Sequence, residues 1–255
     1  MLHYEGYTDV GQTRPINEDS FCLSEYSREM DAAYVIVADG MGGHQAGEVA
    51  SSMAIAQISD TISQGFMAEM ASSDIKELLV QAIKKANSVV YEKGQSEEGC
   101  WGMGTTVTMC FVIGERAFIA NVGDSRAYLL RNGLLHQITV DHSLVQELLQ
   151  KGQITEEEAA NHPQKNVITR ALGTDSGVEI DLYEFTLCDG DMMLLCTDGL
   201  SNMLSNETLT RLLQEKNSSL YAVAEKLVMA ANEAGGYDNI TAVVLTKESG
   251  LGGKE

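Results

Sequence analysis

The chain has 255 residues, of which 44% are hydrophobic, and it carries a formal net charge of −20 at pH 7. This size and apolar content predict one large domain, or at most two small ones, with a core that needs no disulfides. A surface this acidic disfavours nucleic acid and anionic membranes as partners.

Compartment and solubility follow from what the sequence lacks. The N-terminus MLHYEGYTDVG has no apolar signal-peptide core, and no apolar run approaches the ~20 residues of a membrane span. The five cysteines are odd in number and have no CxxC spacing, so we expect buried free thiols in a reducing compartment. These features predict a soluble, cytoplasmic protein.

Strand-like segments are frequent and rich in β-branched and aromatic residues. In chain order, we expect strands over 32–39, 105–113, 116–123, 125–131, 191–198 and 239–246. Hairpin turns are predicted at Gly114-Glu115, Asn132-Gly133 and Asp189-Gly190. Because strands joined by hairpins pair antiparallel, this arrangement predicts two antiparallel sheets packed face to face, with helices outside.

Helical periodicity fills the intervals between these strands. We expect helices over 46–70, 74–93, 143–151, 155–161, 207–215 and 219–234. Asp74 with Glu77 resembles a capping pair, and Thr155 with Glu158 fits a capping box. The polar, glycine-rich residues 248–255 predict a loose tail.

Three aspartates follow or precede predicted strands and stand next to glycine or asparagine: Asp39, Asp198 and Asp238. A hairpin turn is the alternative for Asp39, but a helix rather than a second strand follows it. Asp198 repeats the same strand–Asp-Gly–helix order, whereas Asp238 alone could equally be a turn or capping residue. Carboxylates without cysteine favour Mg²⁺, Mn²⁺ or Ca²⁺ over zinc, so they predict a site for a hard divalent metal.

Other candidates are less specific. Asp124 lies at a tight turn between two predicted strands, and Glu18 and Asp19 are adjacent, so only one of them is expected to reach a given metal directly. Arg14 lies nearby and would bind an anion or pair with an acid. Among the five histidines, only His44 lies near these motifs; it could shuttle a proton or cap the helix that follows.

A set of short motifs, in this order and spacing, resembles the metal-dependent serine/threonine protein phosphatases of type 2C, in particular their small bacterial members. The motifs are TDVGQTRPINEDS, VADGMGGHQAGEVAS, GMGTTVT, ANVGDSRAYLL, ITVDHSL, VITRALG, MLLCTDGLS and YDNITAVV. The resemblance covers residues 4 to about 247. It implies an α+β fold, a four-layer α-β-β-α sandwich, forming one phosphatase domain over 1–247 with a flap insertion at 143–170.

The resemblance also implies a binuclear manganese or magnesium site between the sheets. Asp39 would bridge the two metals, and Asp198 and Asp238 would hold the first. The carbonyl of Gly40 and Glu18, with Asp19 as ligand or in the outer shell, would hold the second. Asp124 would join Asp198 at a third, weaker metal site. Arg14 would bind the substrate phosphate.

Two positions depart from the family pattern. Asn202 stands where many relatives have an aspartate, which predicts weaker binding of a third metal. Met41 directly follows the Asp-Gly pair, where many eukaryotic relatives have a proton-donating histidine, and His44 comes three residues later.

The function expected from the resemblance is hydrolysis of phosphoserine and phosphothreonine by a water that bridges the two metals, reversing serine/threonine kinase signalling. Expected partners are phosphorylated proteins, including a serine/threonine kinase, for a monomeric enzyme without nucleic acid or membrane insertion. Two alternatives are a two-metal phosphodiesterase or nuclease, which the charge of −20 disfavours, and a catalytically weak phosphoprotein-binding module of the same fold.

Overall fold

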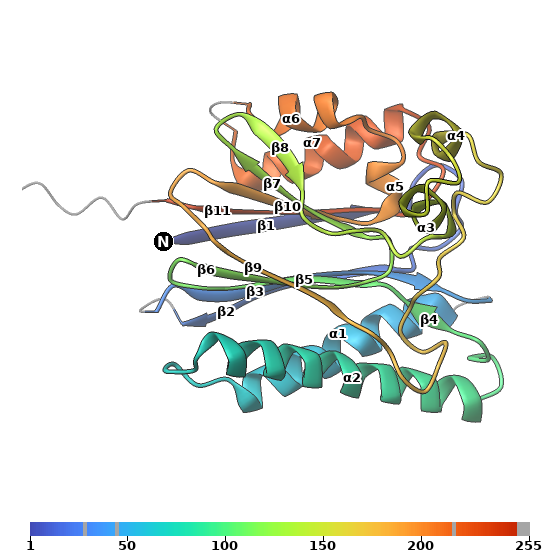
Figure 1. The fold of residues 1–255 in the computed structure, drawn as a ribbon, viewed down its shortest axis with the longest axis horizontal. Helices are drawn as coiled ribbons and strands as arrows, with labels where there is room; N and C mark the ends of the chain where they lie inside the picture. The colour runs from blue at the N-terminus through green and yellow to red at the C-terminus, as the bar shows by residue number, and fades with distance from the viewer. Residues whose placement is uncertain (28–29, 44–45, 216–217, 249–255) are drawn as a thin grey trace, which may run out of the picture.

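The computed structural model describes residues 1–27, 30–43, 46–215 and 218–248. Two antiparallel sheets pack face to face, and helices cover both outer faces (Figure 1). This is the four-layer α+β sandwich expected from the sequence.

The first sheet has the strand order β1-β11-β10-β7-β8. Its strands are β1 (Leu2–Asp9), β7 (Arg126–Arg131), β8 (Leu134–Gln137), β10 (Met192–Cys196) and β11 (Ile240–Lys247). All eight residues of β11 are buried, because this strand has a neighbour on each side and is covered on both faces. Such double coverage explains why its sequence is a nearly continuous apolar run rather than an alternating one.

The second sheet has the order β2-β3-β5-β6-β9, with the two-residue strand β4 paired to the end of β3. Its strands are β2 (Asp19–Ser27), β3 (Ala32–Met41), β4 (Gly104–Thr105), β5 (Val107–Ile113), β6 (Arg116–Val122) and β9 (Asp181–Thr186). Side chains from both sheets, such as Val35, Ile119 and Val243, form the core layer between them.

Helices α1 (Ala46–Gly65) and α2 (Ser72–Ser96) cover the second sheet, and α5 (Asp198–Ser201), α6 (Asn206–Leu213) and α7 (Leu220–Glu233) cover the first (Figure 1). Two short helices, α3 (Leu144–Gln150) and α4 (Glu156–Ala160), belong to the 143–170 segment and lie at the end opposite the N-terminus. No described helix combines the length and apolar character that crossing a bilayer requires.

Several local expectations are wrong. Strands β1, β2, β8 and β9 were not among the expected strands; β1 and β8 mix polar and half-exposed positions, because edge strands have less to bury. Asp189-Gly190 is a turn but not a hairpin, since β9 pairs with β6 and β10 pairs with β7 and β11. Apolar runs on both sides of an Asp-Gly pair therefore do not distinguish a hairpin from a crossing between sheets.

Helix starts give a mixed result. Asp74 and Glu77 do not cap α2, whose N-cap is Ala71 without a side-chain hydrogen bond. The capping box of Thr155 and Glu158 is confirmed at α4. All five cysteines are free, but only Cys110 and Cys196 are buried; Cys22 and Cys100 are partly buried and Cys188 is exposed. The predicted tail lies outside the described residues apart from its first position, 248.

Candidate metal centre

The predicted acidic residues lie together at one end of the sandwich. Asp19 pairs directly with Asp39 across β2 and β3. Asp198 opens α5 two residues after β10, and Asp238 stands two residues before β11, which is paired with β10. Asp124 lies where the chain crosses from β6 in one sheet to β7 in the other. We refer to these five aspartates and Glu18 as the acidic cluster.

The backbone of Asp39 is fixed by Thr105, the last residue of β4, and by Thr106, which lies between β4 and β5. The Asp39 N–H donates to Thr106 Oγ1 at 2.9 Å, and the Asp39 carbonyl accepts from Thr105 Oγ1 and the Thr106 N–H, both at 2.9 Å. The Thr106 hydroxyl also contacts Ser125 Oγ at 2.8 Å. The interruption of the expected 105–113 strand at Thr106 therefore serves to hold the end of β3.

Asp19 is held by two buried hydroxyls. Thr197 Oγ1 and Thr241 Oγ1 both donate to Asp19 Oδ2, at 2.8 and 2.7 Å. The other oxygen, Oδ1, is buried without a hydrogen-bond partner among the described residues. One oxygen is thus fixed by the protein while the other is left for a ligand.

Two glycines let Glu18 and the end of β3 approach the first turn of α1. A Cβ at Gly40 would lie 2.1 Å from the Gly47 carbonyl oxygen, and a Cβ at Gly47 would lie 2.3 Å from Glu18 Oε1. Neither position can accept a side chain without displacing its neighbour. The Gly40 N–H donates to the Glu18 carbonyl at 3.2 Å, and Asn239 Oδ1 accepts from the Glu18 N–H at 2.8 Å.

Arg14 and Asn202 contact members of the cluster directly. Arg14 forms an ion pair of 2.8 Å with Asp238 Oδ2. The Asn202 side chain donates an N–H to Asp198 Oδ2 at 3.0 Å, so here its amide nitrogen, not its oxygen, faces the acid.

The pKa values of the acidic cluster are raised, because its carboxylates lie close together with few positive charges nearby. Burial, together with neighbouring carboxylates, raises the pKa of Asp19 and of Asp124 to about 7 and that of Asp198 to about 6. The pKa of Asp39 is raised well above its ordinary value, by burial first and then by Asp19 and Asp198. Charged carboxylates are therefore unfavourable here unless a cation joins them.

Whether these residues fit a metal can be judged from the carboxylate oxygens that have no hydrogen-bond partner. Glu18 Oε1, Asp19 Oδ1 and Asp124 Oδ1 are all buried without a hydrogen-bond partner in the described chain. Buried polar atoms are normally paired, so three orphaned carboxylate oxygens fit hard divalent cations. As placed, however, no three described Asp, Glu, His or Cys side chains converge closely enough to ligate one ion. Ligation of one ion by three of these side chains would therefore require some of them to change rotamer.

One site residue lies outside the described residues, and another histidine was missed. His44 belongs to the undescribed positions. His142, distant in sequence from the acidic motifs, accepts a hydrogen bond from the Gly123 N–H at 3.0 Å and so holds the turn that carries Asp124. On its other side His142 contacts Asp181 at 3.3 Å. Only the fold reveals this role, because no spacing links these segments.

Threonines and an arginine near the cluster were also missed. Thr197 and Thr241 are polar residues inside apolar strand-like runs, which is the sequence signal that could have indicated them. Arg126, the first residue of β7, follows Asp124 by two positions and makes three hydrogen bonds of 2.6 to 3.0 Å to Asp141. Arg126 is therefore committed to Asp141, and it lowers the pKa of Asp124 less than burial and the neighbouring carboxylates raise it.

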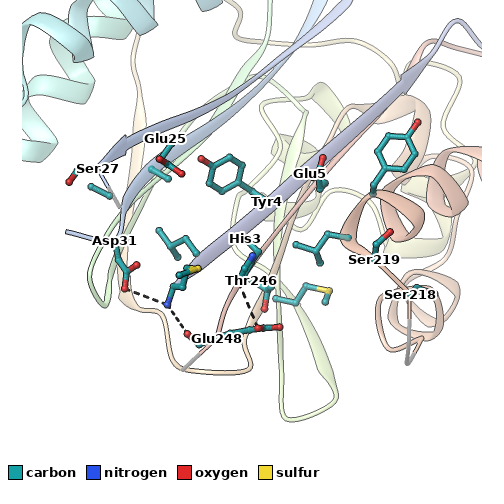
Figure 2. Close-up of a pocket in the computed structure, with 17 residues that line it drawn as sticks. His3, Tyr4, Glu5, Glu25, Ser27, Asp31, Ser218, Ser219, Thr246 and Glu248 are labelled. Carbon is teal, nitrogen blue, oxygen red and sulfur yellow. Dashed lines mark hydrogen bonds and ion pairs between the residues drawn. The ribbon is translucent and has the colours of Figure 1, made fainter. Parts of the chain in front are cut away.

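A cavity larger than the one that opens beside the acidic cluster lies elsewhere in the described chain. It has a volume of about 710 Å³ and is lined by residues of β1 and by Asp31, Thr246 and Glu248 (Figure 2). We call it the far cavity, because it opens at the end of the sandwich where the N-terminus lies (Figure 1). None of the acidic cluster lines it. Two of the acids that line it are paired: Asp31 with the Met1 ammonium at 3.5 Å and Glu248 with His3 at 3.7 Å.

Comparisons with known proteins point to one family. A profile described as protein phosphatase 2C matches residues 12–234. The serine/threonine phosphatase stp of Listeria monocytogenes serotype 4b is 41% identical over 247 residues, covering 97% of this chain and 96% of the relative. The solved Streptococcus agalactiae serine/threonine phosphatase superposes with a TM-score of 0.90 at 38% identity, covering 97% of this chain and 100% of that one. The catalytic domain of the phosphatase PstP, solved in complex with two manganese ions, gives a TM-score of 0.83 at 38% identity, covering 97% and 99%.

Proposed function

The chain belongs to the protein phosphatase 2C family, and from this membership we propose that it hydrolyses phosphoserine and phosphothreonine in proteins with divalent metal cofactors. The observation that carries the proposal is the acidic cluster, whose buried carboxylate oxygens lack partners in the described chain. A phosphoprotein-binding module without catalysis would have no need for such a costly cluster, since buried unpaired acids destabilise a fold. A nuclease would need a basic groove, which a charge of −20 disfavours.

We propose two manganese or magnesium ions, held by the residues expected from the resemblance. Asp39 would bridge them, Asp198 and Asp238 would complete one site, and Glu18 with the Gly40 carbonyl would complete the other. Asp19 would offer its unpaired Oδ1 to this site, as a ligand or from the outer shell, while Thr197 and Thr241 bind its Oδ2.

A third ion would lie between Asp124 and Asp198. We propose that it binds weakly, because Asn202 brings no charge and donates its N–H to Asp198 instead of offering an oxygen. The unpaired Asp124 Oδ1 supports the position of this ion.

When bound, the ions supply Lewis acidity and lower the pKa of water, so that phosphoester hydrolysis proceeds near neutral pH. The protein itself fixes the carboxylates: Asp39 through its backbone, and Asp19 through two hydroxyls. Arg14 has a side chain that is 46% exposed and therefore remains accessible to the substrate. Its planar guanidinium suits two oxygens of a phosphoryl group, so we assign it to orient the phosphate. A general-acid role for His44 stays a prediction.

We further propose that residues 1–247 act as one phosphatase domain with 143–170 as its flap. Phosphorylated proteins, including a serine/threonine kinase, would be the substrates of a monomeric, cytoplasmic enzyme.

A metal-titrated assay tests the function. We expect release of phosphate from phosphothreonine peptides and from p-nitrophenyl phosphate that requires Mn²⁺ or Mg²⁺ and stops with EDTA. Bis-p-nitrophenyl phosphate, a phosphodiester, should be a poor substrate. Binding of phosphopeptides without turnover at any metal concentration would instead favour the non-catalytic module.

A further inference from the structure

A second cavity, of about 280 Å³, opens directly beside the acidic cluster. Asp124 and Asp198 form one of its walls, and the flap forms the other through Val145 and Leu149 of α3 and Lys165. We call it the flap cavity. Because two proposed metal ligands line it, a substrate bound at the metals would have its neighbouring residues at the entrance of this cavity.

The two basic side chains that line the flap cavity, Arg126 and Lys165, differ in whether they are paired with an acid. Arg126, the other lining cation, is held by Asp141 through three hydrogen bonds and contacts Tyr128 at 3.1 Å. The Lys165 side chain is exposed and has no ion pair or hydrogen bond with any residue in the described chain. Asp124, Asp141 and Asp198 also line the cavity and disfavour anions, so an anion would bind at Lys165, the lining cation without a partner in the described chain, when metal ions neutralise Asp124 and Asp198.

The flap side of the cavity is mixed, with the polar Ser143 and Gln146 beside apolar side chains of α3 that are not packed into the core. No residue of α3 is buried, although Val145 and Leu149 are large apolar side chains facing the cavity. Ala159 at the end of α4 also lines this wall. Such a wall can contact the aliphatic part of a side chain whose charged tip reaches Lys165.

We propose that the flap cavity is a substrate subsite for an anionic side chain located within about three residues of the phosphorylated one. The limit of three residues reflects the reach of an extended peptide, which spans ~3.3 Å per residue between the phosphorylated residue and the anionic side chain. Lys165 pairs with the anion, and Val145 and Leu149 contact its aliphatic stem. Aspartate, glutamate and a second phosphorylated residue share this chemistry. The inference rests on the proposed phosphatase function and adds a substrate class to it.

Peptides with one varied position test the subsite. A central phosphothreonine is flanked by alanines, and glutamate, lysine or phosphoserine replaces one alanine at each of the three positions on either side. We measure kcat and KM for each peptide with saturating Mn²⁺. For the wild type, we expect glutamate to improve kcat/KM over alanine by about two- to fivefold at one position, mainly through KM, as for an exposed ion pair. A larger gain from phosphoserine would identify a second phosphate as the preferred anion.

Two variants of Lys165 and a matched lysine complete the design. In Lys165→Ala, the ratio of kcat/KM between the glutamate and alanine peptides should fall to one, and in Lys165→Glu the lysine peptide should become preferred. Lys151 lies on the same flap but pairs with Glu147 at 3.3 Å and does not line the cavity, so Lys151→Ala should keep the wild-type ratio.

The outcomes separate the inference from the function on which it rests. Peptide hydrolysis with no preference for an anion, or a preference that survives in Lys165→Glu, overturns the subsite and leaves the phosphatase intact. Absence of metal-dependent hydrolysis of every peptide and of p-nitrophenyl phosphate overturns both.

Discussion

The two ends of the sandwich are both acidic and both hollowed, yet they differ in how their acids are balanced. In the far cavity, Asp31 and Glu248 are 34% and 70% exposed and pair with the Met1 ammonium and His3 (Figure 2). At the other end, Asp19 and Asp124 are each only 7% exposed, and each has an oxygen without a partner in the described chain. Volume and acidity are thus poor indicators of a metal site; burial without counter-charge is the better one.

The largest expected effect is on catalysis. Asp39→Asn and Asp198→Asn should each lower kcat/KM for p-nitrophenyl phosphate by about a thousandfold or more, because a lost ligand removes several kcal/mol of transition-state stabilisation. Asp31→Asn, the matched change in the far cavity, should alter it by less than about twofold, because exposed pairs contribute little. Full Mn²⁺-dependent activity in either cluster variant would contradict the metal assignment.

Thermal unfolding sharpens the same comparison without an activity readout. Mn²⁺ at a hundred times its dissociation constant should stabilise the wild type by about 2.7 kcal/mol per ion. For a chain of this size that corresponds to a Tm increase of about 5–10 °C. In EDTA, Asp39→Asn should have a higher Tm than the wild type, because it relieves repulsion from Asp19 and Asp198.

The control for this experiment is again Asp31→Asn, which should keep the full Tm increase with Mn²⁺. A Tm of the wild type that does not respond to Mn²⁺ would refute the cluster as a metal site. So would an Asp39→Asn variant less stable than the wild type in EDTA.

The two ends should also respond to pH with opposite signs. Burial raises the pKa of Asp19 to about 7, so the folded metal-free protein keeps a proton that the unfolded chain releases near pH 4. The stability that this group contributes therefore falls as pH rises from about 4 to 7, by on the order of 4 kcal/mol. For Asp191, burial alone would raise the pKa, but its hydrogen bonds with Arg131 and the Cys188 N–H lower it. Its contribution is present above pH 4 and is lost as pH falls through the lowered pKa.

Thermal unfolding in EDTA at pH 4.5 and 7.5 measures the Asp19 effect. The Tm advantage of Asp19→Asn over the wild type should be greater at pH 7.5 by about 6–12 °C, because about 3 kcal/mol of the effect falls in this pH range. A difference that does not change with pH would show that Asp19 titrates normally.

The smallest expected effect concerns two threonines on the same strand, β11. Thr241 Oγ1 donates to Asp19 at the metal end, whereas Thr246 Oγ1 donates to the Asp191 carbonyl at the far end at 2.9 Å. Thr241→Val should raise the Mn²⁺ concentration needed for half-maximal binding about tenfold, as outer-shell changes do. Thr246→Val should leave it unchanged even if the protein loses stability. Calorimetric Mn²⁺ titration compares them, and equal affinities in the two variants would exclude the positioning role of Thr241.

The sequence alone was enough to predict the central strands of both sheets, and it identified the acidic residues of the candidate metal centre. The apolar runs that became β3, β5, β6 and β11 are long and continuous because these strands are covered on both faces, so composition suffices to find them. The edge strands β1 and β8 were not predicted from the sequence, because they bury only part of their length. Local geometry alone also predicted the capping box at Thr155, since its partners are three residues apart.

What only the tertiary structure decided is which distant groups meet. Whether an Asp-Gly pair turns a hairpin or crosses between sheets depends on strand pairing far along the chain, as Asp189-Gly190 shows. The hydroxyls of Thr197 and Thr241, the His142 ring behind the Asp124 turn, and Lys165 beside the acidic cluster were likewise invisible in the sequence. The physical reason is that side-chain identity and spacing fix local hydrogen bonds, whereas burial, and with it the cost of leaving a charge unpaired, is a property of the assembled layers.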